Sequence, residues 1–294
     1  MSTTLPGLIV RSEPPAVALE TTLLVHGVPR ESAFGLHAEL ERIVRSGGST
    51  PALAGVVGGV PIVGMNEGEL RALLSAERVP KANTANLGAL MHGRAHAATT
   101  VSATMELAAA AGVPVFATGG IGGVHKEYAA TLDVSSDLAA LARFPVAVVS
   151  SGVKSILDVP ATREALEAMG VPVVGWRTDR FPAFYLRDGG AGVDWRFDEL
   201  DALAGYVSRE LSRTRRGVLI ACPIPERDEI DRARWEAWCA RAASDAAASG
   251  VSGRDVTPFI LARLHELSAG QTLRANIALV KNNAALAAEI AAKM

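Results

Sequence analysis

The stretch VFATGGIGGVHKEYAATLDVSSDLAALARFPVAVVSSGVKSILD, residues 115–158, contains most of the features that decide the fold and its chemistry. A short β-branched run leads into a glycine-rich turn, and a second apolar run at 146–149 ends just before Lys154. Apolar runs of this length, separated by a helical pattern and bounded by glycine and serine, are typical of buried parallel strands. A lysine just past such a strand lies at the sheet edge where α/β folds bind ligands.

The alternation of strand and helix patterns continues on both sides of this stretch. Helices are predicted at 31–46, 67–74, 99–112, 162–169, 197–211, 226–250, 257–268 and 271–293, strands at 113–117, 171–176 and 217–221, and a hairpin at 52–63 around Gly58 and Gly59. Strands that alternate with helices predict a largely parallel sheet covered on both faces. Neither a linker nor an internal repeat interrupts the pattern, so we expect one domain over residues 1–294.

Composition limits the classes of partner. Hydrophobic residues make up 49% of the 294 residues, and the formal net charge is −2, which gives no general attraction to nucleic acid polymers or anionic membranes. The two cysteines, Cys222 and Cys239, are too few for a metal cage, although one disulfide stays open. The sequence shows neither a signal peptide nor an apolar run of ~18–20 residues, so we expect a cytoplasmic protein without a membrane partner.

Three ionisable residues follow or interrupt apolar runs. Lys154 would be partly desolvated beyond its strand, which lowers the pKa of an amine and frees it to attack a carbonyl; a surface lysine is the alternative. Glu20 lies within ALETTLLV, where burial would raise its pKa and suit a general acid, or where it could pair with a buried base. Lys81 could bind phosphate or sugar, or be solvated.

The remaining candidates lie around the glycine-rich turn and on the last helix. The turn Thr118, Gly119, Gly120 to His125 could cradle an anion with its N–H groups or be a flexible loop, and His125 could touch phosphate or cap a helix. The D-x-S-x-D cluster of Asp133, Ser135 and Asp137 suits hydrated Mg²⁺ or Mn²⁺, whereas Asp137 could also cap the next helix. Asn276 lies on the apolar last helix, where an asparagine amide usually bonds to a neighbouring packed element.

Seven long segments resemble the pseudouridine-5′-phosphate glycosidase family. They are ALETTLLVHGVP (18–29), VFATGGIGGVH (115–125), LDVSSDLAALARFPVAVVSSGVKSILD (132–158), GVPVVGWRTDRFPAFY (170–185), PIPE (223–226), VTPFILARLHELSAG (256–270) and LRANIALVKNNAALAAEIA (273–291). The resemblance implies an α/β/α sandwich with a mixed, largely parallel sheet, a homotrimer and a divalent metal, usually Mn²⁺. The implied reaction is reversible cleavage of the C–C glycosidic bond of pseudouridine 5′-phosphate to uracil and ribose 5-phosphate.

The same resemblance assigns roles by position. Lys154 resembles the nucleophile that forms an imine with C1 of the ring-opened sugar, and Glu20 the proton donor and acceptor. Asp133 would hold the metal. Lys81 and Val101 would line the substrate site, Ser135, Ser136 and Asp137 would contact the sugar phosphate and ring oxygen, and Asn276 would face the aglycone.

Three departures from the family pattern leave the acceptor open. Residues 82–86 read ANTAN where a Ser-Arg-Arg-Asp-like run is usual, Lys126-Glu127 replaces Arg-Gly, and Cys222 replaces an asparagine. We therefore expect either a glycosidase acting on pseudouridine 5′-phosphate or a C-ribosyltransferase that joins ribose 5-phosphate to another aromatic acceptor, such as the naphthoquinone of alnumycin biosynthesis. A non-catalytic sugar-phosphate binder is the third hypothesis.

Overall fold

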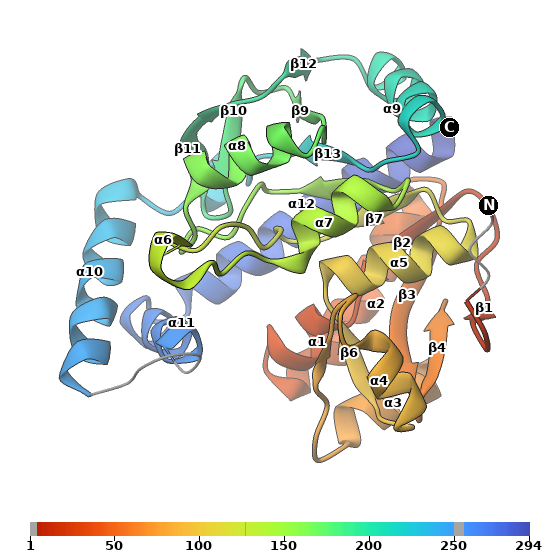
Figure 1. The fold of residues 1–294 in the computed structure, drawn as a ribbon, viewed down its shortest axis with the longest axis horizontal. Helices are drawn as coiled ribbons and strands as arrows, with labels where there is room; N and C mark the ends of the chain where they lie inside the picture. Colours follow the sequence, from red (N-terminus) through yellow and green to blue (C-terminus); the bar gives the residue numbers. More distant parts are fainter. Residues whose placement is uncertain (1–4, 127, 250–255) are drawn as a thin grey trace.

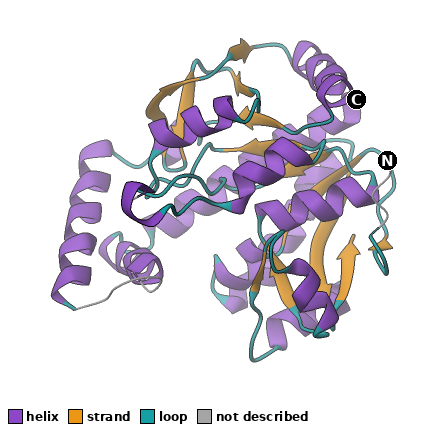
Figure 2. Cartoon of the chain, viewed as in Figure 1, coloured by secondary structure: helices purple, strands orange, loops and turns teal. Residues whose placement is uncertain are grey.

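The computed structural model describes residues 5–126, 128–249 and 256–294. Helices cover both faces of a central sheet, and α10 and α11 project from one end of this layered body (Figure 1). Strands and helices alternate along most of the chain (Figure 2), as the sequence pattern predicts.

The described strands are β1 (Ile9–Val10), β2 (Ala16–Glu20), β3 (Thr50–Val57), β4 (Val60–Val63), β5 (Lys81–Ala82), β6 (Ala97–Thr99), β7 (Val115–Ala117), β8 (Ala147–Ser150), β9 (Val173–Trp176), β10 (Arg180–Ala183), β11 (Leu186–Gly192), β12 (Trp195–Phe197) and β13 (Val218–Ala221). The described helices are α1 (Thr22–His26), α2 (Arg30–Ser46), α3 (Glu67–Ser75), α4 (Leu87–His92), α5 (Val101–Ala111), α6 (Tyr128–Thr131), α7 (Ser136–Arg143), α8 (Val159–Ala168), α9 (Leu200–Thr214), the 3₁₀ turn η1 (Glu226–Asp228), α10 (Arg232–Ala248), α11 (Val256–Leu267) and α12 (Gln271–Lys293).

The main sheet has the strand order β1-β4-β3-β2-β7-β8-β13-β9-β12. Pairing is parallel from β3 through β12, whereas β3 pairs antiparallel with β4 and β6. The four residues of β8 and the three of β7 are all buried, because helices cover both faces of these central strands. The fold is therefore an α/β/α sandwich with a mixed, largely parallel sheet, as predicted.

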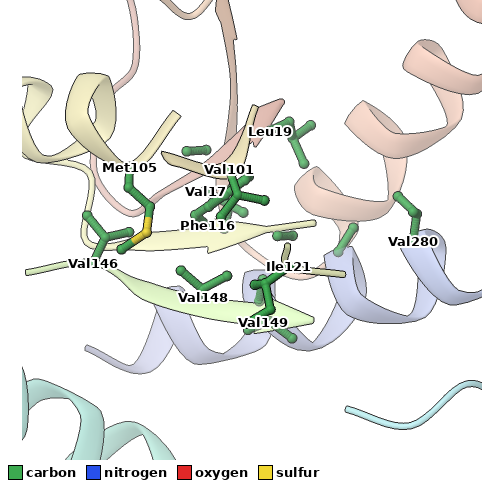
Figure 3. Close-up of a cluster of buried hydrophobic side chains, with 14 of the residues drawn as sticks. Val17, Leu19, Val101, Met105, Phe116, Ile121, Val146, Val148, Val149 and Val280 are labelled. Carbon is green, nitrogen blue, oxygen red and sulfur yellow. The ribbon is translucent and has the colours of Figure 1, made fainter. Parts of the chain in front are cut away.

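The core lies between the central strands and the two helical layers. Helices α5 and α7 lie in front of the sheet in Figure 1, and α12 runs behind it, packed against β2, β7 and β8. Figure 3 shows buried side chains that several elements contribute to this core, among them Val17, Leu19, Val101, Phe116, Val148, Val149 and Val280. The parallel strand ends are thus fixed by packing on both sides.

The structure corrects several predicted boundaries. Thr99 and Phe197, each predicted as the first residue of a helix, are instead the last residues of β6 and β12, so α5 begins at Val101 and α9 at Leu200. The helix predicted over 226–250 is divided into η1 and α10, and its predicted end at Gly250 lies outside the described residues. The 52–63 hairpin is confirmed, with Gly58 and Gly59 both at positive φ, whereas the β10–β11 hairpin was not predicted.

Two further predictions concern cysteines and membranes. Cys222 and Cys239 are free thiols, Cys222 buried and Cys239 half-buried, so the disulfide left open by the sequence does not form between them. Among the described helices, none combines the length and the apolar composition needed to cross a bilayer.

Candidate active site

The register of the parallel strands lines up the candidate residues at one sheet edge. Leu19 pairs with Ala117, and Ala117 pairs with Val149, so the next residues along, Glu20, Thr118 and Ser150, lie side by side. Ser150 itself pairs with Ala221 of β13. Because parallel strands end at the same edge, this alignment brings together chemistry that is about 130 residues apart in the chain.

Lys154 reaches this edge because its turn follows the glycine loop, residues 118–125. Ser151 N–H donates to Gly119 O at 2.9 Å, Ile121 N–H to Gly152 O at 3.0 Å, and Lys154 N–H to Ile121 O at 3.1 Å. The two loops therefore extend the β7–β8 pairing beyond the strands. The side chain of Lys154 is exposed at this edge, so the partial desolvation expected from the sequence is wrong, because the lysine lies beyond the strand end and not against the core.

The environment of Glu20 favours the neutral form of its carboxyl group. Burial raises the pKa of Glu20, and the positive charges of Lys154 and Lys81 and the hydrogen bond donated by the Thr118 hydroxyl offset this only in part. Asp137 also raises the pKa of Glu20. The sequence prediction of a raised pKa is thus confirmed, and the group is suited to donating a proton near neutral pH.

Lys81 approaches the same edge from a different part of the sheet. The Thr21 hydroxyl accepts from Thr99 N–H at 2.9 Å, and that of Thr22 donates to Thr99 O at 2.7 Å, which fixes β6 beside the end of β2. Strand β5, which carries Lys81, pairs with β6. Burial lowers the pKa of Lys81, the Lys154 charge lowers it further, and Glu20 opposes both effects.

The glycines of the turn are required first for packing. A Cβ at Gly120 would lie 2.5 Å from the Phe184 ring, and one at Gly122 would lie 2.3 Å from the Ser135 hydroxyl. Both distances are below contact, so larger residues would force the loop to move. The alternative of a flexible loop is therefore wrong: residues 118–124 are buried and held by neighbours.

Several N–H groups of this loop already donate within the protein, so only some are left to bind an anion. Gly122 N–H donates to the Asp137 carboxylate at 2.8 Å, and Val124 N–H donates to the Thr162 hydroxyl at 2.9 Å. Within the described residues, the N–H groups of Gly119, Gly120 and Gly123 have no protein partner. These three are the ones that remain for the cradle suggested by the sequence.

In the D-x-S-x-D cluster, Ser135 and Asp137 are both engaged in hydrogen bonds within the protein. The Ser135 hydroxyl accepts from Asp137 N–H at 3.2 Å. The N-cap of α7 is therefore Ser135, and not Asp137 as the sequence suggested. The buried Asp137 carboxylate accepts from Ser102 N–H at 2.9 Å and from Gly122 N–H, which ties α5 to the glycine loop. The Ser136 hydroxyl lies 2.9 Å from that of Ser102.

His125 and Asp133 form an exposed pair at the mouth of the loop. Nε2 of His125 lies 3.7 Å from Oδ2 of Asp133, and the His125 N–H donates to Asp133 O at 3.1 Å. Among the described residues, no group of three or more His, Cys, Asp and Glu side chains could hold a metal. A cation here would need water or substrate oxygens in addition to Asp133, which is how Mg²⁺ and similar ions are commonly held.

Helix α12 supplies Asn276 and a residue that the sequence reasoning missed. Asn276, Val280 and Asn283 share one helical face at spacings of four and three, and Val280 would lie 3.1 Å from a Cβ at Gly119. Asn283 is fully buried and donates to Thr118 O at 2.8 Å. An asparagine on the helix face that also carries Val280 and Ala287 is the signal that could have identified it.

The side chain of Val101 packs in the hydrophobic core and is only 2% exposed (Figure 3), so it does not line an open surface of the site. A separate hollow of about 450 Å³ lies between η1 and α12, and its lining contains none of the predicted site residues.

The fold and this edge together define a class of protein. The carboxyl ends of the parallel strands carry a carboxyl group with a raised pKa, two amines and free loop N–H groups. This set suits an α/β enzyme that binds an anionic carbonyl compound and attacks it with an amine.

Comparison with known proteins identifies the family. Residues 9–293 match the family described as Indigoidine synthase A like protein. A pseudouridine-5′-phosphate glycosidase of Methylobacterium nodulans is 48% identical over 278 residues, covering 94% of this chain and 82% of that protein. One of Chloroflexus aurantiacus is 46% identical, with 95% and 93% covered. The chain therefore belongs to the pseudouridine-5′-phosphate glycosidase, or indigoidine synthase A-like, family of enzymes.

Two solved structures share the fold. The prealnumycin C-glycosynthase AlnA in complex with ribulose 5-phosphate has a TM-score of 0.91 at 34% identity, covering 98% of this chain and 97% of AlnA. An indigoidine synthase A-like protein from Thermotoga maritima has a TM-score of 0.88 at 38% identity, with 97% and 96% covered. AlnA is named as a C-glycosynthase, whereas the curated relatives are named as glycosidases.

Proposed function

We propose that this enzyme reversibly cleaves the C–C bond between C1 of ribose 5-phosphate and an aromatic carbon, with pseudouridine 5′-phosphate as the substrate. The observation that carries the proposal is the cluster of Glu20, Lys81 and Lys154 at the strand ends, where the charge of Lys154 acts on both other groups. The relatives named pseudouridine-5′-phosphate glycosidases, 42–48% identical, support the same substrate.

The chemistry needs an amine because a carbon leaving group has no lone pair to protonate, unlike the oxygen that leaves in ordinary glycoside hydrolysis. Opening the ribose ring turns the ring oxygen into a hydroxyl, and the Lys154 amine becomes bonded to C1. The nitrogen lone pair then forms a C=N bond as the bond from C1 to the base breaks. The base carbon keeps that bond's electron pair and takes a proton. Water hydrolyses the imine and releases ribose 5-phosphate and free lysine.

Glu20 is the group placed to move the protons. Its raised pKa favours the protonated carboxyl, which would give its proton to the ring oxygen and regain one from the Lys154 nitrogen as that nitrogen bonds to C1. Glu20 would then pass this second proton to the departing carbon. Lys81 supplies positive charge beside the sugar, and its lowered pKa also makes it the rival nucleophile. The free N–H groups of the glycine loop, with Ser135, Ser136 and His125, form the phosphate side of the site.

A divalent cation, Mn²⁺ or Mg²⁺, belongs to this proposal. The Asp133 carboxylate is 59% exposed and lies beside an imidazole, which is a donor set that Mn²⁺ accepts and that leaves room for waters and a phosphate. Bound there, the cation would neutralise substrate charge. Asp133 would hold it, and His125 would orient that carboxylate.

The acceptor side supports a second candidate function, C-ribosylation of another aromatic carbon. In place of a charged run, residues 82–86 form a closed neutral turn, in which Asn83 N–H donates to Asn86 at 2.8 Å and Asn86 donates to Lys81 O at 3.0 Å. The likeness to AlnA adds support. Assaying purified enzyme with ribose 5-phosphate and either uracil or a hydroxynaphthoquinone separates the two, because normal turnover of uracil would exclude the second.

Borohydride trapping tests the amine step directly. With ribose 5-phosphate, reduction should attach the pentose phosphate to Lys154, and mass spectrometry of the digested protein locates the adduct. Lys154→Arg, which keeps the charge, should give no adduct and no turnover. Attachment to Lys81 would reassign the nucleophile, and the absence of any adduct would favour the non-catalytic sugar-phosphate binder. We also propose a homotrimer, which light scattering of the purified protein would test.

A further inference from the structure

We propose that Asn283 is a positioning residue. Its side-chain amide holds two loops in the arrangement that the reaction needs: the loop of Thr118, which bonds to Glu20, and the loop that leads to Lys154. The inference rests on the proposed function for its catalytic part. It concerns a side chain that lies behind the site, on α12, and would not touch the substrate.

The hydrogen bonds of Asn283 reach both strand-end loops. Its amide nitrogen donates to Thr118 O at 2.8 Å and to Gly119 O at 3.4 Å, both just past β7. The same nitrogen lies 3.2 Å from the Ser151 hydroxyl, just past β8. Ser151 in turn donates to Cys222 O at 2.9 Å, just past β13. One buried amide thus connects three neighbouring strand ends.

These bonds act on the reacting groups through one residue on each side. Thr118 accepts from Asn283 with its main-chain oxygen and donates to Glu20 with its side-chain hydroxyl. Ser151 begins the turn that ends at Lys154, with Gly152 and Val153 between them. Carbonyl oxygens cannot bond to one another, so Thr118 O and Gly119 O need a donor between them, and the Asn283 amide nitrogen with its two N–H groups supplies it. The apolar residues around Asn283 on α12 offer no substitute.

The neighbouring residue Asn282 provides a matched control. It is also an α12 asparagine, and it donates to the Cys222 thiol at 3.1 Å and to Pro223 O at 3.2 Å, so it bonds beyond β13 and not to the glycine loop. Asn282→Ala removes the same chemical group one position away. It should weaken folding without changing the Glu20 side of the site.

The experiment compares Asn283→Ala with Asn282→Ala in the full-length enzyme. Asn283→Ala should lower kcat by about 10- to 100-fold, because small misplacements at reacting groups have effects of that order, and should leave KM within about threefold. It should also shift the Glu20 limb of the pH profile to higher pH, because the Thr118 hydroxyl would no longer be held against the Glu20 carboxylate. Thr118→Val, which removes that hydroxyl, should shift the limb in the same direction. The double variant should shift the Glu20 limb no further than Thr118→Val alone, because both changes act on Glu20 through the one hydrogen bond from Thr118.

A titration of Glu20 by carbon-13 NMR keeps the test independent of turnover. If the proposed function is wrong, wild-type enzyme will neither cleave pseudouridine 5′-phosphate nor form an adduct, yet the Glu20 titration should still move in Asn283→Ala and not in Asn282→Ala. Should Asn283→Ala fail to fold, Asn283→Ser, which keeps a hydroxyl in the cavity, replaces it. A folded Asn283 variant with wild-type kcat and an unmoved Glu20 titration would overturn the positioning role.

Discussion

Replacing Gly152 with alanine tests whether the turn before Lys154 is held in one conformation by contact. Gly152 has φ of +72°, and a Cβ there would lie 1.8 Å from Pro182 O. The left-handed backbone costs an alanine about 1–2 kcal/mol. The forced shift of Pro182 or of the turn adds about 1–3 kcal/mol, as overpacking does. Together these predict a loss of roughly 2–5 kcal/mol in the free energy of unfolding.

Gly112 separates the two contributions. It has φ of +74° at the end of α5, and no atom lies within 4 Å of its Cβ position. Gly112→Ala should therefore lose only the backbone part, about 1–2 kcal/mol. Urea unfolding of both variants measures the difference. Because the displaced turn carries Lys154, Gly152→Ala should also reduce kcat by about 100-fold, whereas Gly112→Ala should not. Equal losses of stability in the two variants would refute the contact argument.

Two further predictions concern Glu20 and Asp133. The folded pKa of Glu20 is raised above its ordinary value of 4.5, so its contribution to stability is fully present below that value and is lost as pH rises through the folded pKa. Glu20→Gln should therefore be more stable than wild type at pH 8 and lose this advantage near pH 4, while kcat falls by about 10²–10⁴-fold. An exposed control, Glu13→Gln, should show no such crossover. A stability difference at Glu20 that does not depend on pH would contradict the raised pKa. Asp133→Asn should need at least about tenfold more Mn²⁺ for half-maximal activity, measured by titrating metal into chelator-treated enzyme, and an unchanged Mn²⁺ requirement would remove Asp133 as the ligand.

Local patterns were enough to predict most of the elements. The spacing of apolar residues gave α2 and α12, and the Gly58-Gly59 turn gave the β3–β4 hairpin. Errors arose where two short elements adjoin: Ala97–Thr99 and Trp195–Phe197 each precede a helix without a glycine or proline to mark the boundary. As three-residue strands, they form because β3 and β9 provide hydrogen-bond partners, which local sequence does not report.

The sequence by itself determined which residues are candidates for the chemistry, because a carboxyl group or an amine beside a buried apolar run can be identified from the order of side chains. Only the tertiary structure decided how those groups act on one another. The strand register places Glu20 beside Thr118, the glycine loop brings Lys154 back to the sheet edge, and α12 inserts Asn283 behind both. Ionisation depends on burial and on charges a few ångströms away, and those distances exist only once distant segments have packed together.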